Sequence, residues 1–95
     1  MANRHLSRSI ALQSLFEWDF HDRKSEGLGA IVDQNIEEFA PGLDDTRFTK
    51  ALVASVVEHR DKLDQVIEKF APDWPIGQIG IVDRNVLRIG LVELL

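Results

Sequence analysis

The residues best suited to chemistry stand at the amino terminus, where Arg4, His5 and Arg8 precede the first acidic side chain. All 16 acidic residues lie at Glu17 or later, although the chain as a whole carries a net charge of −5. A helix brings residues four apart to the same side, so the two arginines can reach one ligand. Arginine binds phosphate bidentately and stacks on unpaired bases, and charges beyond about 8–10 Å are largely screened. The start of the chain is therefore a candidate RNA-binding surface, and the simpler alternative is a solvated chain end.

No catalytic constellation accompanies these arginines. The sequence has no cysteine, and it lacks a nucleophile elbow, a Walker loop, a glycine-rich dinucleotide turn and closely spaced histidines. The carboxylates fall on the polar sides of amphipathic segments, where a solvated face explains them better than an acid/base pair. His59 lies on an apolar face, where we expect a hydrogen-bonded histidine of the core or its boundary. These features predict a binding module, not an enzyme, with no metal and no cofactor.

Length and hydropathy point to one domain formed by residues 1–95. A chain of this size buries about 60–65% of its unfolded surface, which is enough for one modest core. No apolar run approaches the roughly 18–20 residues that span a bilayer, and the amino terminus has no export signal, which favours the cytosol.

Helical periodicity predicts the elements that position the arginines. Residues 4–20 form a helix with a wide apolar surface, which Asn3 or Ser7 could cap. Residues 29–39 form a second, short helix. Residues 44–70 read as one long third helix, capped by Asp44 and Asp45, with Arg60 and Asp64 paired on its solvated side. The Pro72 to Pro75 segment ends that helix, and residues 76–81 allow only a turn or two.

The closing stretch, residues 82–95, has a different pattern. Its first turns carry a polar stripe of Arg84, Asn85 and Arg88, but from residue 89 onward Glu93 is the sole charge. Asp83 is a plausible N-cap. A helix that is apolar on all sides is a buried helix, so this segment is predicted to be the central post of a helical bundle.

Two segments together resemble the NusB family. Residues 4–18, RHLSRSIALQSLFEW, are similar to its basic start followed by Ala-x-Gln-x-Leu-Tyr/Phe and a nearby tryptophan. Residues 82–95, VDRNVLRIGLVELL, are similar to its segment of an acidic residue, Leu-Arg-Ile/Leu-Ala/Gly and Glu-Leu. Trp74 also falls where the family often has one.

The resemblance implies an all-α, NusB-like helical bundle that acts as a bacterial transcription antitermination factor. Such a factor binds boxA-type nascent RNA together with the ribosomal protein NusE, within the transcription elongation complex that reads rRNA operons. RNA contact carries over to Arg4 and Arg8, with His5 where another arginine is common. A weaker role in the RNA and NusE surface carries over to Phe16 and Asp83.

The resemblance covers the first two thirds of such a domain, because family members continue for roughly two more helices. The sequence thus reads as incomplete at its carboxyl end, with four side chains of the closing helix left partly uncovered and inclined to self-associate, namely Leu91, Val92, Leu94 and Leu95. Two alternatives remain open. One is the leading RNA-binding domain of an rRNA cytosine methyltransferase, and the other is a purely protein-binding helical module.

Overall fold

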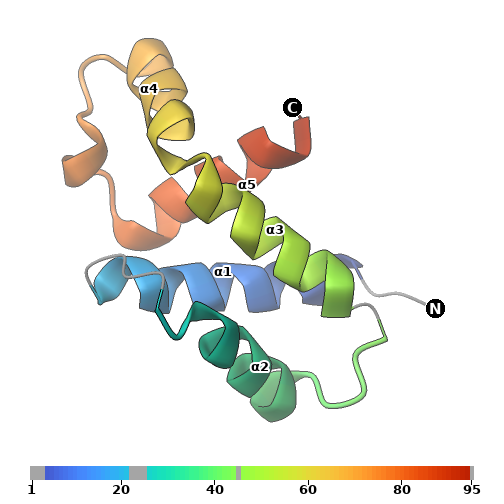
Figure 1. The fold of residues 1–95 in the computed structure, drawn as a ribbon. Helices are drawn as coiled ribbons and strands as arrows, with labels where there is room; N and C mark the ends of the chain where they lie inside the picture. Colours follow the sequence, from blue (N-terminus) through green and yellow to red (C-terminus); the bar gives the residue numbers. More distant parts are fainter. Residues whose placement is uncertain (1–3, 22–25, 45, 95) are drawn as a thin grey trace.

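The computed structural model describes residues 4–21, 26–44 and 46–94, and every element in these ranges is helical (Figure 1). The order is α1 (Arg4–Phe20), α2 (Leu28–Phe39), α3 (Thr46–Glu58), α4 (Arg60–Phe70), the 3₁₀ turn η1 (Ile76–Gln78) and α5 (Ile81–Leu94). The predicted all-α class is confirmed, and the first two helices begin and end within one residue of their predicted bounds. The expected break at the Pro72 to Pro75 segment is also confirmed.

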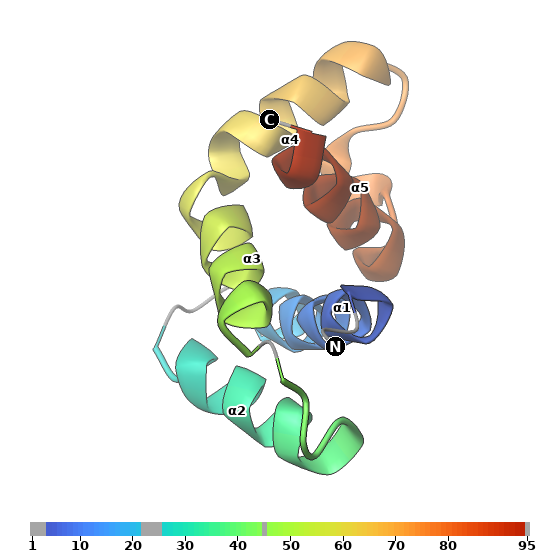
Figure 2. The ribbon, with the colours of Figure 1, turned by 90° about the vertical axis from the view of Figure 1, so that its right-hand side faces the viewer.

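The central helix is α1, which contacts α2, α3 and α5 (Figures 1 and 2). Its apolar residues cover a wide arc, so it can be covered from several sides at once. The prediction that the closing helix would be the central post is therefore wrong. The main core cluster is built around the α1 side chains and consists of Ala11, Leu15, Trp18, Val32, Leu52, Val53, Val56, Leu63 and Ile89.

The predicted single helix over residues 44–70 is broken at His59 into α3 and α4. The backbone hydrogen bonds continue through the break, from His59 N to Ser55 O at 3.0 Å and from Leu63 N to His59 O at 2.9 Å. His59 Nδ1 also lies 3.0 Å from Ser55 O. A carbonyl oxygen has two lone pairs, so Ser55 O accepts from the backbone N–H of His59 and can also accept from Nδ1–H of its ring. The kink turns α4 toward α5 (Figure 2).

Helix α5 buries its polar stripe and exposes much of its apolar surface. Asn85 and Arg88 are fully buried, whereas four large apolar side chains are exposed, namely Val82, Val86, Leu87 and Leu94. The expectation of a helix buried for its apolar character is thus wrong, because carboxylates on α1 and α4 neutralise the stripe. At the carboxyl end Leu91 and Val92 are half-buried, so only part of that end is open.

Several predicted caps do not have that role. Helix α5 begins at Ile81, so Asp83 lies in its first turn and is not the N-cap. Ser7 is buried within α1 and does not cap it. Three residues singled out in the sequence, Asn3, Asp45 and Leu95, lie outside the described residues. Over the same described ranges, no helix has the length and apolar character needed to cross a membrane.

Candidate nucleic-acid interface

The two amino-terminal arginines converge on one aromatic ring. The Cζ atom of Arg4 lies 3.8 Å from the centroid of the Phe48 ring, and that of Arg8 lies 5.8 Å from it. Both distances fall within the range of cation–π attraction. Helix α1 supplies the cations from successive turns, and α3 supplies the ring beside them. The predicted convergence of the two arginines is therefore present, and Phe48 is a member of the site that sequence reasoning missed.

Glu93 is the second missed member. Arg8 Nε donates to Glu93 Oε1 at 2.8 Å and to Oε2 at 3.0 Å, while Arg8 Nη2 donates to Oε2 at 2.7 Å. The hydrogen bonds from Arg8 lower the pKa of Glu93 against the opposing effect of partial burial, and the charges of Arg8 and Arg4 add to that lowering. In the sequence Glu93 stands out as the sole charge near the end of an otherwise apolar segment, but nothing there identifies Arg8 as its partner.

A shallow groove between α1 and α5 extends from this cluster. His5 and Arg8 line its first pocket, of about 200 Å³, together with Ser9, Leu12, Val86 and Ile89. The adjoining pocket, of about 370 Å³, shares Ser9 and Leu12 and adds Gln13, Phe16 and Val82. The structure thus brings His5, Arg8 and Phe16 to one surface, with charge at one end and apolar side chains along its length.

The remaining predicted surface residue, Asp83, is not part of this arrangement. It is exposed in the first turn of α5, and it is not among the described residues that line either pocket. Phe16 stacks on Phe20 with ring centroids 6.0 Å apart, so its ring is held in place at the far end of the groove. Of the two secondary candidates, only Phe16 lines the groove that begins at Arg8.

A buried ionic network sets the position of α5 against α1. Arg84 binds Asp19 bidentately, with Nε to Oδ2 at 2.6 Å and Nη2 to Oδ1 at 2.7 Å. Asn85 Nδ2 and Arg88 Nη1 both donate to Asp19 Oδ2 at 3.0 Å. Burial raises the pKa of Asp19, but hydrogen bonds from Arg84 and Asn85 outweigh it, so the pKa is lowered overall. Helix α5 is thereby fixed where Glu93 meets Arg8.

The network continues from α5 to α4. Arg88 Nε and Nη2 donate to the two carboxylate oxygens of Asp64 at 2.7 and 2.9 Å. The predicted pair of Arg60 with Asp64 on a solvated face is therefore wrong. Arg60 bonds instead to Asp61, while both carboxylate oxygens of Asp64 accept from Arg88 on α5.

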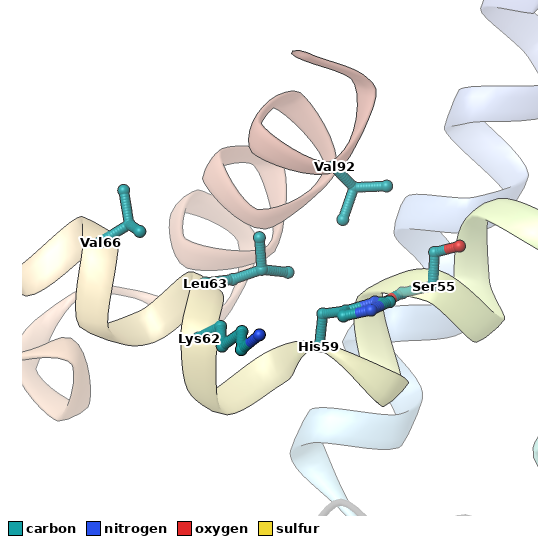
Figure 3. Close-up of a pocket in the computed structure, with 6 residues that line it drawn as sticks. All are labelled: Ser55, His59, Lys62, Leu63, Val66 and Val92. Carbon is teal, nitrogen blue, oxygen red and sulfur yellow. The ribbon is translucent and has the colours of Figure 1, made fainter. Parts of the chain in front are cut away.

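A separate pocket of about 360 Å³ lies where the kink meets α5 (Figure 3). Its lining is mostly apolar and consists of Ser55, His59, Lys62, Leu63, Val66 and Val92. His59 is exposed at this pocket, with its ring beside Ser55. The expectation of a hydrogen-bonded histidine is confirmed, but its placement in the core or at its boundary is wrong, because His59 is exposed. No arginine of the amino-terminal cluster lines this pocket.

Comparison with known proteins assigns the chain to a family. The family model described as the NusB family matches residues 5–95. A transcription antitermination protein NusB from Roseiflexus castenholzii is 41% identical over 92 residues, covering 97% of this chain and 63% of the relative. One from Chloroflexus aggregans is 38% identical over 94 residues, covering 99% of this chain and 61% of the relative. The chain thus spans less than two thirds of the length of these relatives, and no solved structure gives a significant match. By its sequence, this chain belongs to the NusB family.

Proposed function

We propose that this protein is a transcription antitermination factor that binds boxA-type single-stranded RNA together with the ribosomal protein NusE. One observation carries the proposal, namely the convergence of Arg4 and Arg8 over Phe48 at an amino terminus without acidic residues. Membership of the NusB family supports the transcriptional role. Arginines held side by side beside an aromatic ring suit phosphates and unstacked bases.

The groove between α1 and α5 gives each residue a role. Arg4 and Arg8 neutralise neighbouring phosphates, and His5 adds a donor at the start of the groove. The apolar side chains that follow, as far as Phe16, accept the face of an unpaired base. Asp83 lies away from these groups, so in this proposal its role is toward a protein partner.

The small number of cations makes the protein partner necessary. Two arginines neutralise only a few phosphates, and the net charge of −5 opposes RNA at longer range. NusE and the elongation complex would supply the remaining contacts, in the cytoplasm where transcription occurs. The measured affinity for RNA should therefore rise when NusE is added.

The test is a titration of fluorescently labelled boxA-type single-stranded RNA at several salt concentrations, with and without NusE. The variant Arg4→Ala/Arg8→Ala should weaken binding and flatten the dependence of log K on log salt, by about 0.7 for each net phosphate neutralisation that is lost on a single strand. Unchanged affinity and slope in this variant would exclude the proposed site.

The matched control removes two cations from another helix. Arg60→Ala/Lys69→Ala makes the same change in net charge on α4, which packs against α3, α5 and η1. This variant should bind RNA as the unmodified protein does. An equal loss in both double variants would indicate a general effect of charge and no defined surface. Absence of RNA binding even with NusE would favour a protein-binding module.

A further inference from the structure

The Arg8 guanidinium is already bound to an anion within the chain. Glu93 takes its Nε and Nη2 edge with three hydrogen bonds of 2.7–3.0 Å. A phosphate presents two anionic oxygens to the same edge of a guanidinium, in the same bidentate geometry. The carboxylate therefore occupies the position that an RNA phosphate would take.

A second pair in the molecule has the same geometry but a different environment. Arg88 binds Asp64 bidentately, and the Arg88 side chain is only 1% exposed. The Arg8 side chain is 45% exposed and that of Glu93 is 27% exposed. Water and salt screen an exposed pair strongly, and such pairs add little to stability. Arg88 thus stays bound to Asp64, whereas Arg8 can exchange the Glu93 carboxylate for another anion.

The surroundings of Glu93 favour such an exchange at this place. Arg4 contributes to the lowered pKa of Glu93, so both arginines act on this carboxylate. Glu93 stands on α5, near the end of that helix, while both arginines stand on the first turns of α1. Movement of one glutamate side chain would expose the paired edge of Arg8 without unfolding either helix.

We propose that Glu93 competes with RNA phosphate for Arg8, so that the protein keeps one of its RNA-contacting arginines neutralised until RNA displaces the carboxylate. This proposal rests on the proposed function, because it concerns the regulation of the same site. In the unmodified protein the exchange is nearly neutral in charge, since each Arg8–phosphate contact leaves the Glu93 carboxylate unpaired. With glutamine at position 93, the contact of Arg8 with a phosphate would neutralise one phosphate charge and leave no carboxylate unpaired.

The size of the effect follows from counterion release. One more neutralised phosphate on a single strand steepens the salt dependence of log K by about 0.7. With equal affinities at about 1 M salt as the reference, the variant Glu93→Gln should bind RNA about eightfold more tightly at 50 mM salt and about threefold more tightly at 200 mM. The amide keeps an oxygen that accepts from Arg8 Nε, so the placement of the guanidinium changes little.

The experiment titrates the same labelled RNA into the unmodified protein, Glu93→Gln, Arg8→Ala and Arg8→Ala/Glu93→Gln, with circular dichroism to verify folding. Asp33→Asn is the matched control, because Asp33 is an exposed carboxylate on α2 that pairs with Lys50 on α3. The control should leave affinity unchanged. In the double-mutant cycle, most of the gain from Glu93→Gln should disappear when Arg8 is absent.

The outcomes separate this proposal from the proposed function. If Arg4→Ala/Arg8→Ala weakens RNA binding but Glu93→Gln leaves it unchanged or weakens it, Glu93 positions Arg8 and does not compete for it, and this inference fails alone. If neither arginine matters, the proposed RNA site fails as well. If Glu93→Gln tightens binding equally when Arg8 is absent, the effect comes from the change in net charge. That result would also contradict the proposed competition for Arg8.

Discussion

Replacing Asp19 by asparagine tests the buried network that holds α5 against α1. The side chain of Asp19 is fully buried and receives hydrogen bonds from Arg84, Asn85 and Arg88. Asparagine has nearly the same shape, but it removes the charge that neutralises the two arginines. Arg88 keeps the charge of Asp64, whereas Arg84 loses its carboxylate and keeps neutral acceptors, the amide oxygen and two backbone carbonyl oxygens at 3.3 and 3.5 Å.

The cost is large because one partner of a buried ion pair is removed. Such changes typically cost 3–5 kcal/mol, and the remaining hydrogen bonds place this one near the lower end, at about 3 kcal/mol. For a chain of 95 residues this loss lowers the melting temperature by more than about 10 °C. Urea unfolding followed by circular dichroism gives the free energy directly. Asp61→Asn is the control, because the Asp61 side chain is 83% exposed, and it should cost less than about 0.5 kcal/mol.

The same variant has a defined pH dependence. The pKa of Asp19 is lowered in the folded protein, so the stability it contributes is fully present above its unfolded value of about 3.9. That contribution is lost as the pH falls through the lower folded pKa. The difference in unfolding free energy between the unmodified protein and Asp19→Asn should therefore be constant near neutral pH and shrink below about pH 4. A difference no larger than that of Asp61→Asn, or one independent of acid pH, would refute the role of the network.

Three other predictions concern the core, the aromatic ring and the exposed apolar face. Leu15→Ala removes a fully buried core side chain and should lower the free energy of unfolding in urea by about 2–5 kcal/mol. Phe70→Ala, at a position 81% exposed, should lower it by less than about 0.5 kcal/mol. Similar losses in the two variants would contradict the described core. Phe48→Leu removes the ring beside the arginines and should weaken RNA binding about two- to fivefold in the same titration; unchanged binding would remove the ring from the site. Exposed apolar residues on α5 predict self-association, which Leu87→Glu should reduce in light scattering, and a protein that is monomeric at every concentration would contradict it.

Local sequence patterns predicted where the helices begin and end better than they predicted what packs around each helix. The periodicity of residues 4–20 and 29–39 and the proline segment after Phe70 sufficed to place helix boundaries. The break at His59 was missed because every residue there has acceptable helix propensity, and the contact of the imidazole with Ser55 O depends on the rotamer of one side chain. The orientation of α5 was missed because periodicity identifies a polar stripe but not the carboxylates that can bury it.

Some residues of the candidate site could be predicted from the sequence, and others could not. Arg4, His5 and Arg8 could be named from the sequence because residue type and helical spacing alone place them together. Phe48 and Glu93 could not, because they come from α3 and α5 and meet α1 only after the helices pack. Asp83 has a charge and a place at a helix start, yet packing leaves it apart from the cluster.

The helical class, the NusB family and the basic amino terminus can all be read from the sequence, because these properties depend on neighbours along the chain. Helix packing is what makes α1 the central helix, brings Asp19 and Asp64 to the buried Arg88, and pairs Arg8 with Glu93. A buried charge requires a counter-charge, and packing supplies that counter-charge from residues distant in the sequence.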